Sequence, residues 1–530
     1  MKRQNPEGTK PSVGPGSRRA CCTVIPGDLY KPHRDYSAMQ LDKLLKSAGL
    51  DAFCPTSDPD VTAVVYDSRQ AGPGSCFVAV RGSENDGHDF ISAAVDSGCC
   101  AVVCEDPVDV PDTVSLVVVE DSHIALGRLA QAFQGGPADK LVKVGVTGTN
   151  GKTTVTHLVH RIFEASGRPT ALLGTVGYET GQRSIESNAT TPDPVTLAEA
   201  MSEMVRARRT HLVMEVSSHA LDQHRTAGVD FRVGVFTNIS GDHLDYHGTI
   251  ENYVAAKRRL FESLGPEGVA VINRDDDYAG EMAQAAKGGG AAVKFYGLGP
   301  GCDYAGSMLN LDYSGASFNV TTAGGSIEVR SPMIGEHNVM NSLAAIGACE
   351  VLGVDLADIS AALACSAVVP GRLEPVEGGG DFRVFVDYAH TDDALKNVLS
   401  ALNDLKRGRL IVVFGCGGNR DRSKRPRMGK VASELADRVV VTSDNPRSED
   451  PQAIIDQVLG GIDAAFRDRC DVCVDRRQAI ETAIDEARGG DIVLIAGKGH
   501  ETYQEIAGRR IDFSDVRTAS EILKGRQEAK

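Results

Sequence analysis

Short apolar runs alternate with amphipathic stretches along most of the chain. Between residue 39 and about residue 139, the apolar runs lie at residues 62–66, 76–80, 101–103 and 115–119. Runs of this length are typical of buried strands, and the amphipathic stretches between them are typical of helices that cover a sheet. This part of the chain therefore predicts a small α/β domain.

The alternation is clearest after residue 368. Five apolar runs are separated there by helical stretches, at residues 384–386, 410–414, 438–441, 472–474 and 492–495. This order is typical of a doubly wound, Rossmann-like parallel sheet, which binds ligands beyond the carboxyl ends of its strands. Three runs are followed by polar segments: Asn419-Arg420-Asp421-Arg422, Ser443-Asp444-Asn445-Pro446-Arg447 and Gly497-Lys498-Gly499-His500-Glu501. We therefore expect a binding site at this edge of the sheet.

A candidate phosphate-binding loop opens the middle of the chain. The apolar run 141–146 leads into Thr147-Gly148-Thr149-Asn150-Gly151-Lys152-Thr153-Thr154, which a helical stretch at 155–165 follows. Glycines let backbone N–H groups curl around phosphate oxygens, while Lys152 would neutralise the β- and γ-phosphates of ATP and Thr153 would ligate Mg²⁺. The usual spacing requires glycine where Val146 stands. The alternative is a glycine-rich turn with an exposed lysine.

These patterns divide the chain into three α/β domains and an N-terminal extension. We expect the small domain at residues 39–140, a central P-loop ATPase-like domain at 141–367 and the doubly wound domain at 368–530. Residues 1–38 are rich in Pro and Gly and lack periodicity, which predicts a disordered extension. A start of translation at Met39 would remove it.

Composition narrows the classes of function. The net charge is −16, aromatic residues make up 5% and Trp is absent, which argues against nucleic acid as a partner. No run of about 18 apolar residues occurs, so we expect no membrane span. The 13 Cys follow no disulfide-like spacing, which favours reduced thiols and a cytoplasmic location. Cys470 and Cys473 lie in an apparent strand and would point to opposite faces.

Acidic and imidazole side chains follow two further apolar runs. Glu215 ends one run, and His243 follows another. At neighbouring strand ends, these two side chains could hold Mg²⁺ together with Thr153. His243 and His247 have the spacing of a zinc protease motif, but Leu244 stands where the catalytic Glu is needed, so we reject that interpretation.

Lys257 lies on the apolar face of a predicted helix at 250–264, three residues after Val254 and four before Phe261. One interpretation is a lysine whose stem packs while its amine reaches water. The other is a buried amine with a lowered pKa, which CO₂ can carbamylate to give a carboxylate-like ligand for Mg²⁺. The residues by themselves favour the first interpretation.

Motifs from all three domains occur in the order of the Mur ligase superfamily. They are the phosphate loop, Glu215, His243, Gly335-Glu336-His337-Asn338-Val339-Met340-Asn341 and Pro370-Gly371-Arg372. The chain resembles this family from about Met39 to its C-terminus. The resemblance implies a ligase of peptidoglycan synthesis that uses ATP and Mg²⁺, activates a carboxylate as an acyl phosphate and couples it to an amine. We expect the enzyme to be a cytoplasmic monomer.

The resemblance also implies roles for individual residues. The catalytic set would be Lys152, Glu215, His243 and Lys257, and Lys257 matches the lysine that is carbamylated in this family. Magnesium would be held by Thr153, Glu215, His243 and carbamylated Lys257. The nucleotide would contact Thr147, Gly148, Thr149, Asn150, Gly151, Lys152 and Thr153, together with Asn341, Arg372 and Asp387. A UDP-muramoyl dipeptide would contact Ser68, Ser83, Glu84, Asn85, Thr190, Thr191, Ser217, Gln223 and Arg225.

The loop Asp444-Asn445-Pro446-Arg447 resembles the signature of family members that add meso-diaminopimelate rather than L-lysine. The far end of diaminopimelate carries a carboxylate, which suits the fork of Arg447. Arg420 would supply a second cation, Glu501 an acceptor for the ammonium, and Gly497 a close backbone contact. L-lysine would leave Arg447 unpaired. A surface arginine in a turn is the alternative.

The reaction implied adds meso-diaminopimelate to the D-glutamate γ-carboxylate of UDP-MurNAc-L-Ala-D-Glu. Folylpolyglutamate synthetase shares the phosphate loop and domain plan, but the diaminopimelate-type loop and the additional N-terminal domain argue against it. A nucleotide-binding regulator without catalysis would not need Lys152, Glu215, His243 and Lys257 together. No side chain stands out as the base for the attacking amine.

Overall fold

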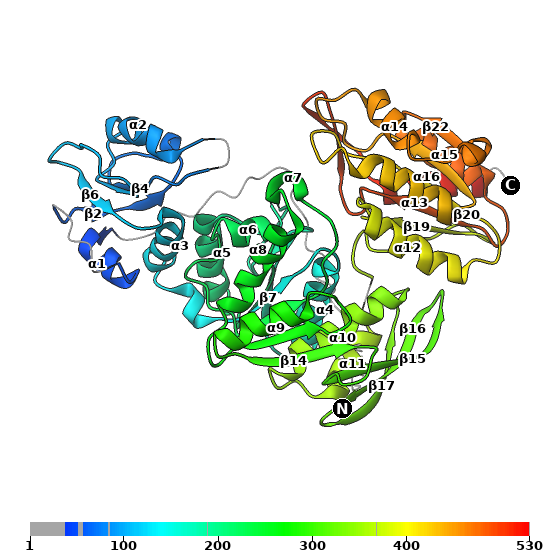
Figure 1. Ribbon diagram of the computed structural model, residues 1–530, viewed down its shortest axis with the longest axis horizontal. Coiled ribbons are helices and arrows are strands. Elements are labelled where there is room, and N and C mark those ends of the chain that lie inside the picture. Colours follow the sequence, from blue (N-terminus) through cyan, green and yellow to red (C-terminus); the bar gives the residue numbers. More distant parts are fainter. Residues whose placement is uncertain (1–37, 51–56, 83–84, 188, 367, 529–530) are drawn as a thin grey trace, which may run out of the picture.

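The computed structural model describes residues 38–50, 57–82, 85–187, 189–366 and 368–528. Figure 1 shows three lobes that follow one another along the chain, coloured from blue through green to red. Each lobe is built on a sheet of its own, in agreement with the α/β class that the sequence predicts. The expected extension 1–38 lies outside the described residues except for Ala38, and so do Ser83 and Glu84.

The first lobe contains a parallel sheet in the order β3-β4-β5-β6. Helices α1 and α3 cover one face and α2 covers the other, so both faces are apolar. The elements are β1 (Met39–Gln40), α1 (Leu41–Ser47), β2 (Asp60–Val61), β3 (Ala63–Val65), η1 (Ser68–Gln70), β4 (Ser75–Val78), η2 (Gly87–Phe90), α2 (Ile91–Asp96), β5 (Ala101–Cys104), β6 (Ser115–Val118) and α3 (Ser122–Phe133).

The central lobe contains, within the described ranges, an eleven-stranded mixed sheet in the order β10-β9-β8-β11-β7-β12-β13-β14-β15-β16-β17. Strands β8 to β15 in this order are parallel, and β15, β16 and β17 form an antiparallel meander. Helices α4, α10 and α11 pack on one face, and α5, α8 and α9 pack on the other. The strand that carries the phosphate loop, β7, therefore lies in the middle of a sheet covered on both faces.

The central lobe contains helices and strands from residue 137 to residue 364. They are η3 (Pro137–Lys140), β7 (Val142–Thr147), α4 (Lys152–Ala165), β8 (Thr170–Leu173), β9 (Tyr178–Glu179), β10 (Ser184–Ile185), α5 (Pro194–Arg206), β11 (His211–Glu215), α6 (Ser218–Asp222), β12 (Val233–Phe236), α7 (Leu244–His247), α8 (Ile250–Glu262), β13 (Val269–Asn273), α9 (Ala279–Gly288), β14 (Ala292–Gly297), β15 (Tyr304–Asp312), β16 (Gly315–Thr322), β17 (Gly325–Ser331), α10 (Glu336–Glu350) and α11 (Leu356–Ala364).

The C-terminal lobe is a doubly wound sheet in the order β18-β19-β23-β20-β21-β22, and all its pairs except β18–β19 are parallel. Helices α12, α13 and α14 cover one face, and α15 and α16 cover the other. Its elements are β18 (Glu374–Val376), β19 (Arg383–Asp387), α12 (Asp392–Leu405), β20 (Leu410–Phe414), α13 (Lys424–Leu435), β21 (Arg438–Thr442), α14 (Pro451–Leu459), η4 (Ala464–Arg469), β22 (Cys470–Cys473), α15 (Arg476–Glu486), β23 (Ile492–Ala496), β24 (Tyr503–Ile506), β25 (Arg509–Asp512) and α16 (Asp515–Glu528).

The cysteine pair of β22 behaves as the strand pattern predicts. Cys470 packs against the apolar cluster under α12, α13 and α14, whereas Cys473 packs against the cluster under α15 and α16. Both thiols are free. The two side chains therefore lie on opposite faces of the sheet.

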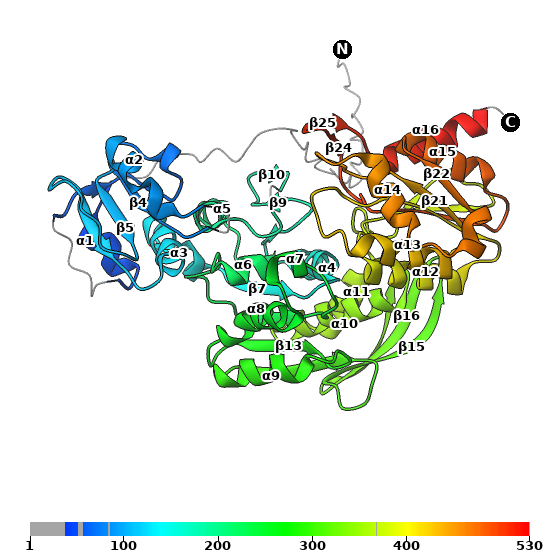
Figure 2. The same ribbon diagram turned by 45° about the horizontal axis from the view of Figure 1, so that its top comes forward.

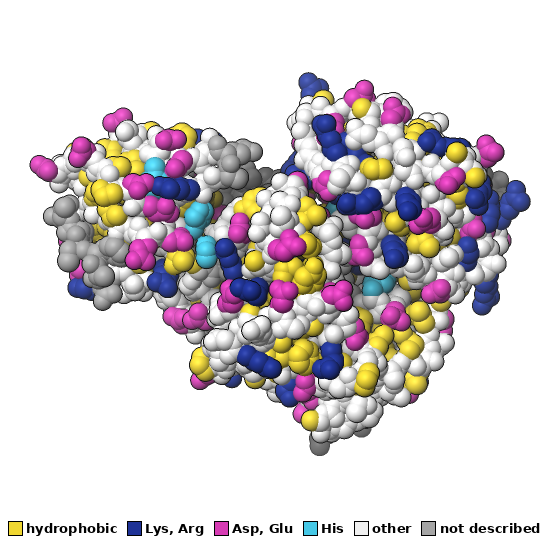
Figure 3. Space-filling view, viewed as in Figure 1, with side chains coloured by type: hydrophobic (Ala, Val, Ile, Leu, Met, Phe, Trp, Pro, Cys, Tyr) yellow, Lys and Arg dark blue, Asp and Glu magenta, His cyan; other side chains and the backbone are white. Residues whose placement is uncertain are grey.

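The described parts of the central and C-terminal lobes contact each other both at β15 and β16 and at the phosphate loop. Figure 2 shows β15 and β16 reaching beneath α12, where the Tyr313 hydroxyl donates to the Leu405 carbonyl. At the phosphate loop, Asn150 Nδ2 donates to Asp393 Oδ2 of α12 over 2.7 Å. The space-filling view in Figure 3 shows a hollow over the central lobe, between the first and C-terminal lobes. No described helix combines the length and apolarity that a membrane crossing requires.

Candidate functional site

The phosphate loop joins β7 to α4, and two of its positions strongly favour glycine. A Cβ at Gly148, whose φ is +147°, would lie 1.8 Å from Thr237 Oγ1. A Cβ at Gly151, whose φ is +86°, would lie 2.3 Å from Asn341 Oδ1. Helix α4 begins directly afterwards at Lys152, so its free N–H groups and dipole point into the loop. The local sequence thus forms an anion cradle.

Two lysines converge on this loop. Lys152 Nζ and Lys257 Nζ each donate to the Gly148 carbonyl over 2.8 Å. Lys257 is 1% exposed, so its amine does not reach water. The interpretation in which only the stem packs and the amine is solvated is therefore wrong. Burial, with the nearby Lys152 charge, lowers the pKa of Lys257 well below its usual value. A neutral amine is the form that reacts with CO₂, and burial favours it here.

Glu215, at the end of β11, lies directly beside the loop. Thr153 Oγ1 donates to Glu215 Oε1 over 3.0 Å, and Arg372 Nη2 donates to Thr153 Oγ1 over 2.9 Å. The Thr175 backbone N–H also donates to Glu215 Oε1, over 2.8 Å. A buried carboxylate and a hydroxyl in contact are oxygen donors of the kind that Mg²⁺ prefers, so these residues fit such an ion.

His243 stands apart from that pair. Strands β11 and β12 lie on either side of β7, so Glu215 and His243 follow strands that flank the loop strand and are not paired with each other. His243 lies edge-on to His219, with ring centroids 4.8 Å apart. In the part of the chain that the structure describes, no three His, Cys, Asp or Glu lie close enough to hold a metal. The expected magnesium set is thus only partly assembled, and it stays a prediction.

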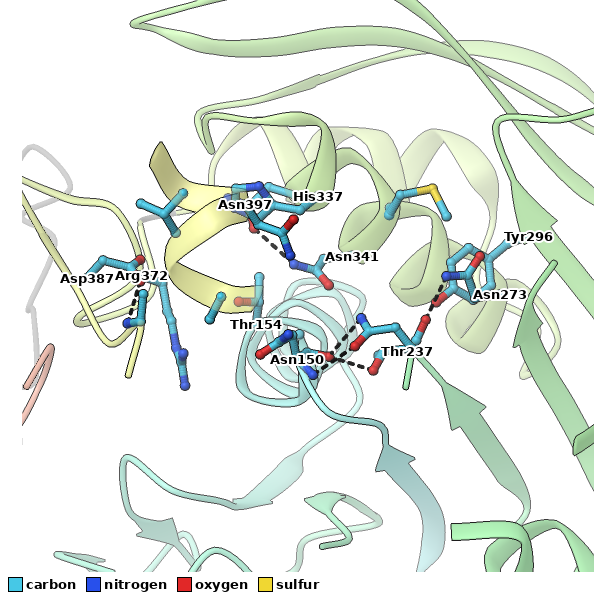
Figure 4. Close-up of a pocket in the computed structure, with 17 residues that line it drawn as sticks. Asn150, Thr154, Thr237, Asn273, Tyr296, His337, Asn341, Arg372, Asp387 and Asn397 are labelled. Atoms are coloured by element: carbon cyan, nitrogen blue, oxygen red, sulfur yellow. Dashed lines mark hydrogen bonds between the residues drawn. The ribbon is translucent and has the colours of Figure 1, made fainter. Parts of the chain in front are cut away.

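A cavity of about 170 Å³ opens beside the phosphate loop, between the central and C-terminal lobes. Figure 4 shows Asn150, Asn341 and Thr237 on one side of it and Arg372 with Asp387 on the other. Three of its lining residues were expected to meet the nucleotide from outside the loop: Asn341, Arg372 and Asp387. Amide side chains carry both donors and acceptors, which suits the polar edge of a purine.

Sequence reasoning missed several lining residues of this cavity. His337 and Asn338 lie in the motif that also contains Asn341, so the motif was a usable signal for them. Further lining residues come from separate strands, loops and helices and carry no motif, among them Asn238, Asn273, Tyr296, Asn397 and Val398. Only the packing of β12, β13, β14 and α12 around one space brings them together.

Asp387 shapes the loop beside the cavity. Its carboxylate accepts the backbone N–H groups of Leu373 and Ala389, over 2.7 and 2.8 Å. Burial raises its pKa, and the Arg372 charge acts in the opposite direction. Arg372 stacks on the Tyr388 ring, with its guanidinium carbon 4.8 Å from the ring centroid. Asp387 therefore holds the chain that presents Arg372 to the phosphate loop.

A second polar cluster lies on the other side of Glu215. Thr191 Oγ1 donates to the Glu215 carbonyl over 2.9 Å, and the Ser217 N–H donates to Thr191 Oγ1 over 3.0 Å. Arg225 Nη1 donates to the Thr191 carbonyl over 3.0 Å and Nη2 to Gln223 Oε1 over 2.7 Å. Four residues expected to bind the acceptor substrate are therefore connected through hydrogen bonds.

The other residues expected to bind the acceptor substrate do not all lie in this cluster. Thr190 joins the same region through a 3.1 Å hydrogen bond to Thr175. Ser68 and Asn85 lie in the first lobe, Ser68 at the start of η1, which the Asp67 side chain caps. The expected acceptor contacts therefore fall in two places, the cluster around Glu215 and the first lobe.

The three polar loops of the C-terminal lobe meet at the carboxyl edge of its sheet. Lys498 Nζ is fully buried and donates to Asn445 Oδ1 over 3.0 Å and to Glu501 Oε2 over 2.7 Å. Asn445 Nδ2 also donates to Glu501 Oε2, over 2.8 Å. A Cβ at Gly497, whose φ is +113°, would lie 2.6 Å from Asp444 Oδ2. Sequence reasoning named this edge but assigned no role to Lys498.

Arg447 is held in an unusual backbone conformation at this edge. Its φ is +53°, and β24 fixes it through Arg447 N–H to the Glu505 carbonyl and Ala507 N–H to the Arg447 carbonyl, over 3.0 and 2.7 Å. Its Nη1 donates to the Gly418 carbonyl over 2.7 Å. An arginine in a free surface turn would not need these contacts. Arg420 is exposed and hydrogen-bonds only the neighbouring Asn419 carbonyl among described residues.

Comparison with known proteins agrees with this architecture. Residues 60–134 match the Mur ligase family, catalytic domain; residues 146–349 match the Mur ligase middle domain; and residues 371–499 match the Mur ligase, glutamate ligase domain. Together these matches cover parts of all three lobes.

Individual relatives share most of the chain. A UDP-N-acetylmuramoyl-L-alanyl-D-glutamate–2,6-diaminopimelate ligase of Syntrophomonas wolfei is 42% identical over 92% of this chain and 100% of its own length. One from Geobacillus thermodenitrificans is 44% identical over 89% and 96%.

Solved structures show the same fold. A ligase of that name covers 88% of this chain and 96% of its own, with 37% identity and a TM-score of 0.64. The MurF ligase of Thermotoga maritima in complex with ADP shares the fold at 21% identity, with a TM-score of 0.58, over 88% of this chain and 98% of its own. The chain therefore belongs to the Mur ligase family.

Proposed function

We propose that the chain is an ATP-dependent ligase that adds meso-diaminopimelate to the D-glutamate γ-carboxylate of UDP-MurNAc-L-Ala-D-Glu in peptidoglycan synthesis. One observation carries the proposal. A phosphate cradle with two lysines lies in the central lobe, and a loop with a constrained arginine, Arg447, lies in the C-terminal lobe. Relatives that are 40–44% identical over most of the chain have the name of this activity.

The nucleotide would lie across the junction of these two lobes. The loop N–H groups and Lys152 would bind the triphosphate, and the cavity lined by Asn341 and His337 would take the base. Arg372 contacts Thr153 across the junction, so its guanidinium is placed to stabilise negative charge that develops on the phosphates.

Magnesium would be held by Thr153, Glu215, His243 and carbamylated Lys257. Bound there, the ion would neutralise phosphate oxygens and so allow a second anion, the substrate carboxylate, to approach. The contact between Thr153 and Glu215 and the buried amine of Lys257 support this assignment. For His243 the support is its place on the loop after β12, at the same edge of the sheet.

The acceptor substrate would extend from the first lobe to the phosphate loop. Arg225 and Gln223 would hold its carboxylate and amide groups, and Thr191 and Ser217 lie next to Glu215, where the γ-carboxylate must arrive. The UDP end would lie near Ser68 and Asn85, together with Ser83 and Glu84.

The amino acid would bind at the edge formed by Asp444, Asn445, Arg447, Gly497 and Glu501. Its distal carboxylate pairs with the guanidinium of Arg447, and its distal ammonium with Glu501. The γ-carboxylate of D-glutamate first attacks the γ-phosphate of ATP, which forms the acyl phosphate and releases ADP. The amine at the other end of the amino acid then attacks the acyl carbon, a tetrahedral intermediate forms, the amine loses a proton to a base, and phosphate leaves. Closure of the lobes excludes water, which would otherwise hydrolyse the acyl phosphate. Pro446 would belong to the same loop site, and Arg420, which is exposed, would add a second cation at its rim.

A single chain supplies every group in this scheme, so we propose a monomer that acts in the cytoplasm, where ATP and UDP-linked precursors are available. The base that accepts the proton of the attacking amine is left open.

Release of phosphate from ATP tests the proposal directly. The protein is mixed with ATP, magnesium and UDP-MurNAc-L-Ala-D-Glu, with meso-diaminopimelate, with L-lysine or with neither. We expect rapid release only with meso-diaminopimelate, and mass spectrometry should detect the UDP-tripeptide. The proposal would be refuted if the rate of phosphate release did not depend on the UDP-dipeptide, or if release required a folate and glutamate instead.

A further inference from the structure

One buried arginine connects the two strand ends from which the amino-acid loops start. Arg476, in the first turn of α15, donates through Nη1 to the Ser443 carbonyl over 3.3 Å and through Nη2 to the Ala496 carbonyl over 3.0 Å. Ser443 immediately precedes Asp444, and Ala496 immediately precedes Gly497. The guanidinium therefore lies directly behind both loops.

These two carbonyls belong to strands that do not pair with each other. In the sheet order β23-β20-β21, strand β20 separates β23, which ends at Ala496, from β21, which Ser443 follows. The ladder between neighbouring strands ends near these positions. Beyond it the loops are joined by other contacts, such as the Arg447 N–H to the Glu505 carbonyl and Lys498 Nζ to Asn445 Oδ1. Arg476 spans the end of β20 and bonds to both sides, so one rigid, planar group connects the two strand ends directly, in addition to the contacts between the loops.

Asp515 holds the arginine from behind. Its two carboxylate oxygens accept from Arg476 Nε and Nη2, both over 2.8 Å, and both side chains are 0% exposed. Asp515 is the first residue of α16, so the C-terminal helix also connects to the loops through this pair. Burying an ion pair carries a desolvation penalty that offsets much of the attraction between the two charges. A pair of apolar residues of similar volume often stabilises a core equally well.

We propose that Arg476, oriented by Asp515, is a positioning residue that sets the separation of the Asp444 and Gly497 loops and thereby the affinity and selectivity for the amino-acid substrate. The inference rests on the proposed function. The Arg476 side chain is fully buried behind the strand ends, so it acts through the loops. Its guanidinium also supplies positive charge near Asp444 and Glu501.

The same sheet offers a matched control at its opposite edge. Arg409 donates to Asp491 and Glu486 through a similar fork, just before β20 and β23 begin. This ion pair network fixes the amino ends of the strands, far from the substrate loops. Loss of Arg409 should therefore affect folding stability without changing which amino acid is used.

The experiment compares Arg476→Met with Arg409→Met in the full-length protein. A double variant, Arg476→Met with Asp515→Leu, removes both buried charges at once, and Asp515→Asn weakens the pair more gently. For each variant, KM is measured for meso-diaminopimelate, ATP and UDP-dipeptide, together with the rate ratio for meso-diaminopimelate against L-lysine and the Tm.

We expect KM for meso-diaminopimelate to rise about tenfold or more in the Arg476 variants, with a loss of selectivity over L-lysine, because small displacements of binding groups are costly. KM for ATP should stay within about twofold, because the hydrogen bonds of Arg476 in the described structure go to Ser443, Ala496 and Asp515, all in the C-terminal lobe. Arg409→Met should lower Tm and leave all three KM values unchanged.

Two results would overturn the inference. One is an unchanged meso-diaminopimelate KM and selectivity in the double variant or, if that variant does not fold, in Asp515→Asn. The other is an equal rise of all three KM values, which indicates general loss of structure. Failure of the proposed function looks different, because the unmodified protein would then not ligate meso-diaminopimelate at all.

Discussion

The phosphate loop and the three loops proposed to bind the amino acid are built in different ways. The phosphate loop is one continuous segment, and its groups are backbone N–H donors made accessible by Gly148 and Gly151 at the start of α4. The amino-acid site has three segments that follow three strands, and side chains such as Lys498 and Arg447 cross-link them.

The difference lies in which interactions define each site. The cradle depends on local backbone conformation, so a short motif specifies it. The amino-acid site depends on distances between strands, so it needs buried polar groups that fix those distances. Changes in the first region should therefore act on ATP use, and changes in the second should act on amino-acid use.

The largest expected effect belongs to the first region. Lys257→Ala should lower the ligation rate by about 10²–10³-fold, because a group that supports phosphate transfer is lost. Added formate or acetate should restore part of the rate by replacing the carbamate. Carbon-13 NMR with labelled bicarbonate should detect a carbamate in the unmodified protein and not in the variant.

Lys143 provides the control for that variant. It is also buried, with a pKa that burial lowers, but it donates to the Ala138 carbonyl at the opposite end of β7. Lys143→Met should keep its ligation rate. A full rate in Lys257→Ala would remove the carbamate from the proposed mechanism.

The next effect separates the two regions. Arg447→Lys keeps the charge but removes the fork, so KM for meso-diaminopimelate should rise about 10- to 100-fold, as expected for one lost charge-assisted hydrogen bond. KM for ATP should not change. Steady-state kinetics with each substrate varied in turn gives both values, and equal increases would contradict the assigned pocket.

Two glycines give a paired test of smaller size. Gly148→Ala places a Cβ against Thr237, and Gly497→Ala places one against Asp444, each in a backbone conformation that alanine disfavours. Each should cost about 1–3 kcal/mol locally. Gly148→Ala should raise KM for ATP, and Gly497→Ala should raise KM for meso-diaminopimelate. If Gly148→Ala raised KM for meso-diaminopimelate and Gly497→Ala raised KM for ATP, the two regions would not have the separate roles proposed.

The smallest effect is a pH dependence of the second region. Burial raises the pKa of Glu501, although Lys498 opposes the shift. As the pH falls through this raised pKa, the carboxylate is protonated and no longer attracts an ammonium, so KM for meso-diaminopimelate should increase a few-fold toward acidic pH. KM for ATP provides the internal comparison. Glu501→Gln should have a higher KM that no longer responds to pH in this range.

Much of the fold follows from patterns that are local in the chain. The apolar runs at 410–414 and 492–495 are strands in the structure, because a strand covered on both faces must be apolar throughout. The start of α4 was expected at 155 and lies at Lys152, since the loop glycine Gly151 is itself the helix cap. The boundaries between the domains at 140 and 367 remain predictions.

By itself, the sequence determined the phosphate cradle, the alternation of strands and helices, and the edge of the C-terminal sheet where polar loops gather. These features depend on neighbours in the chain, so a short segment contains all the information. The burial of Lys257 against the Gly148 carbonyl, the cavity wall supplied by Asn273 and Tyr296, and the bridge from Arg476 to two unpaired strands depend on contacts between distant segments. Such contacts exist only once the sheets and helices have packed, because only packing sets the distances between groups that the chain itself keeps far apart.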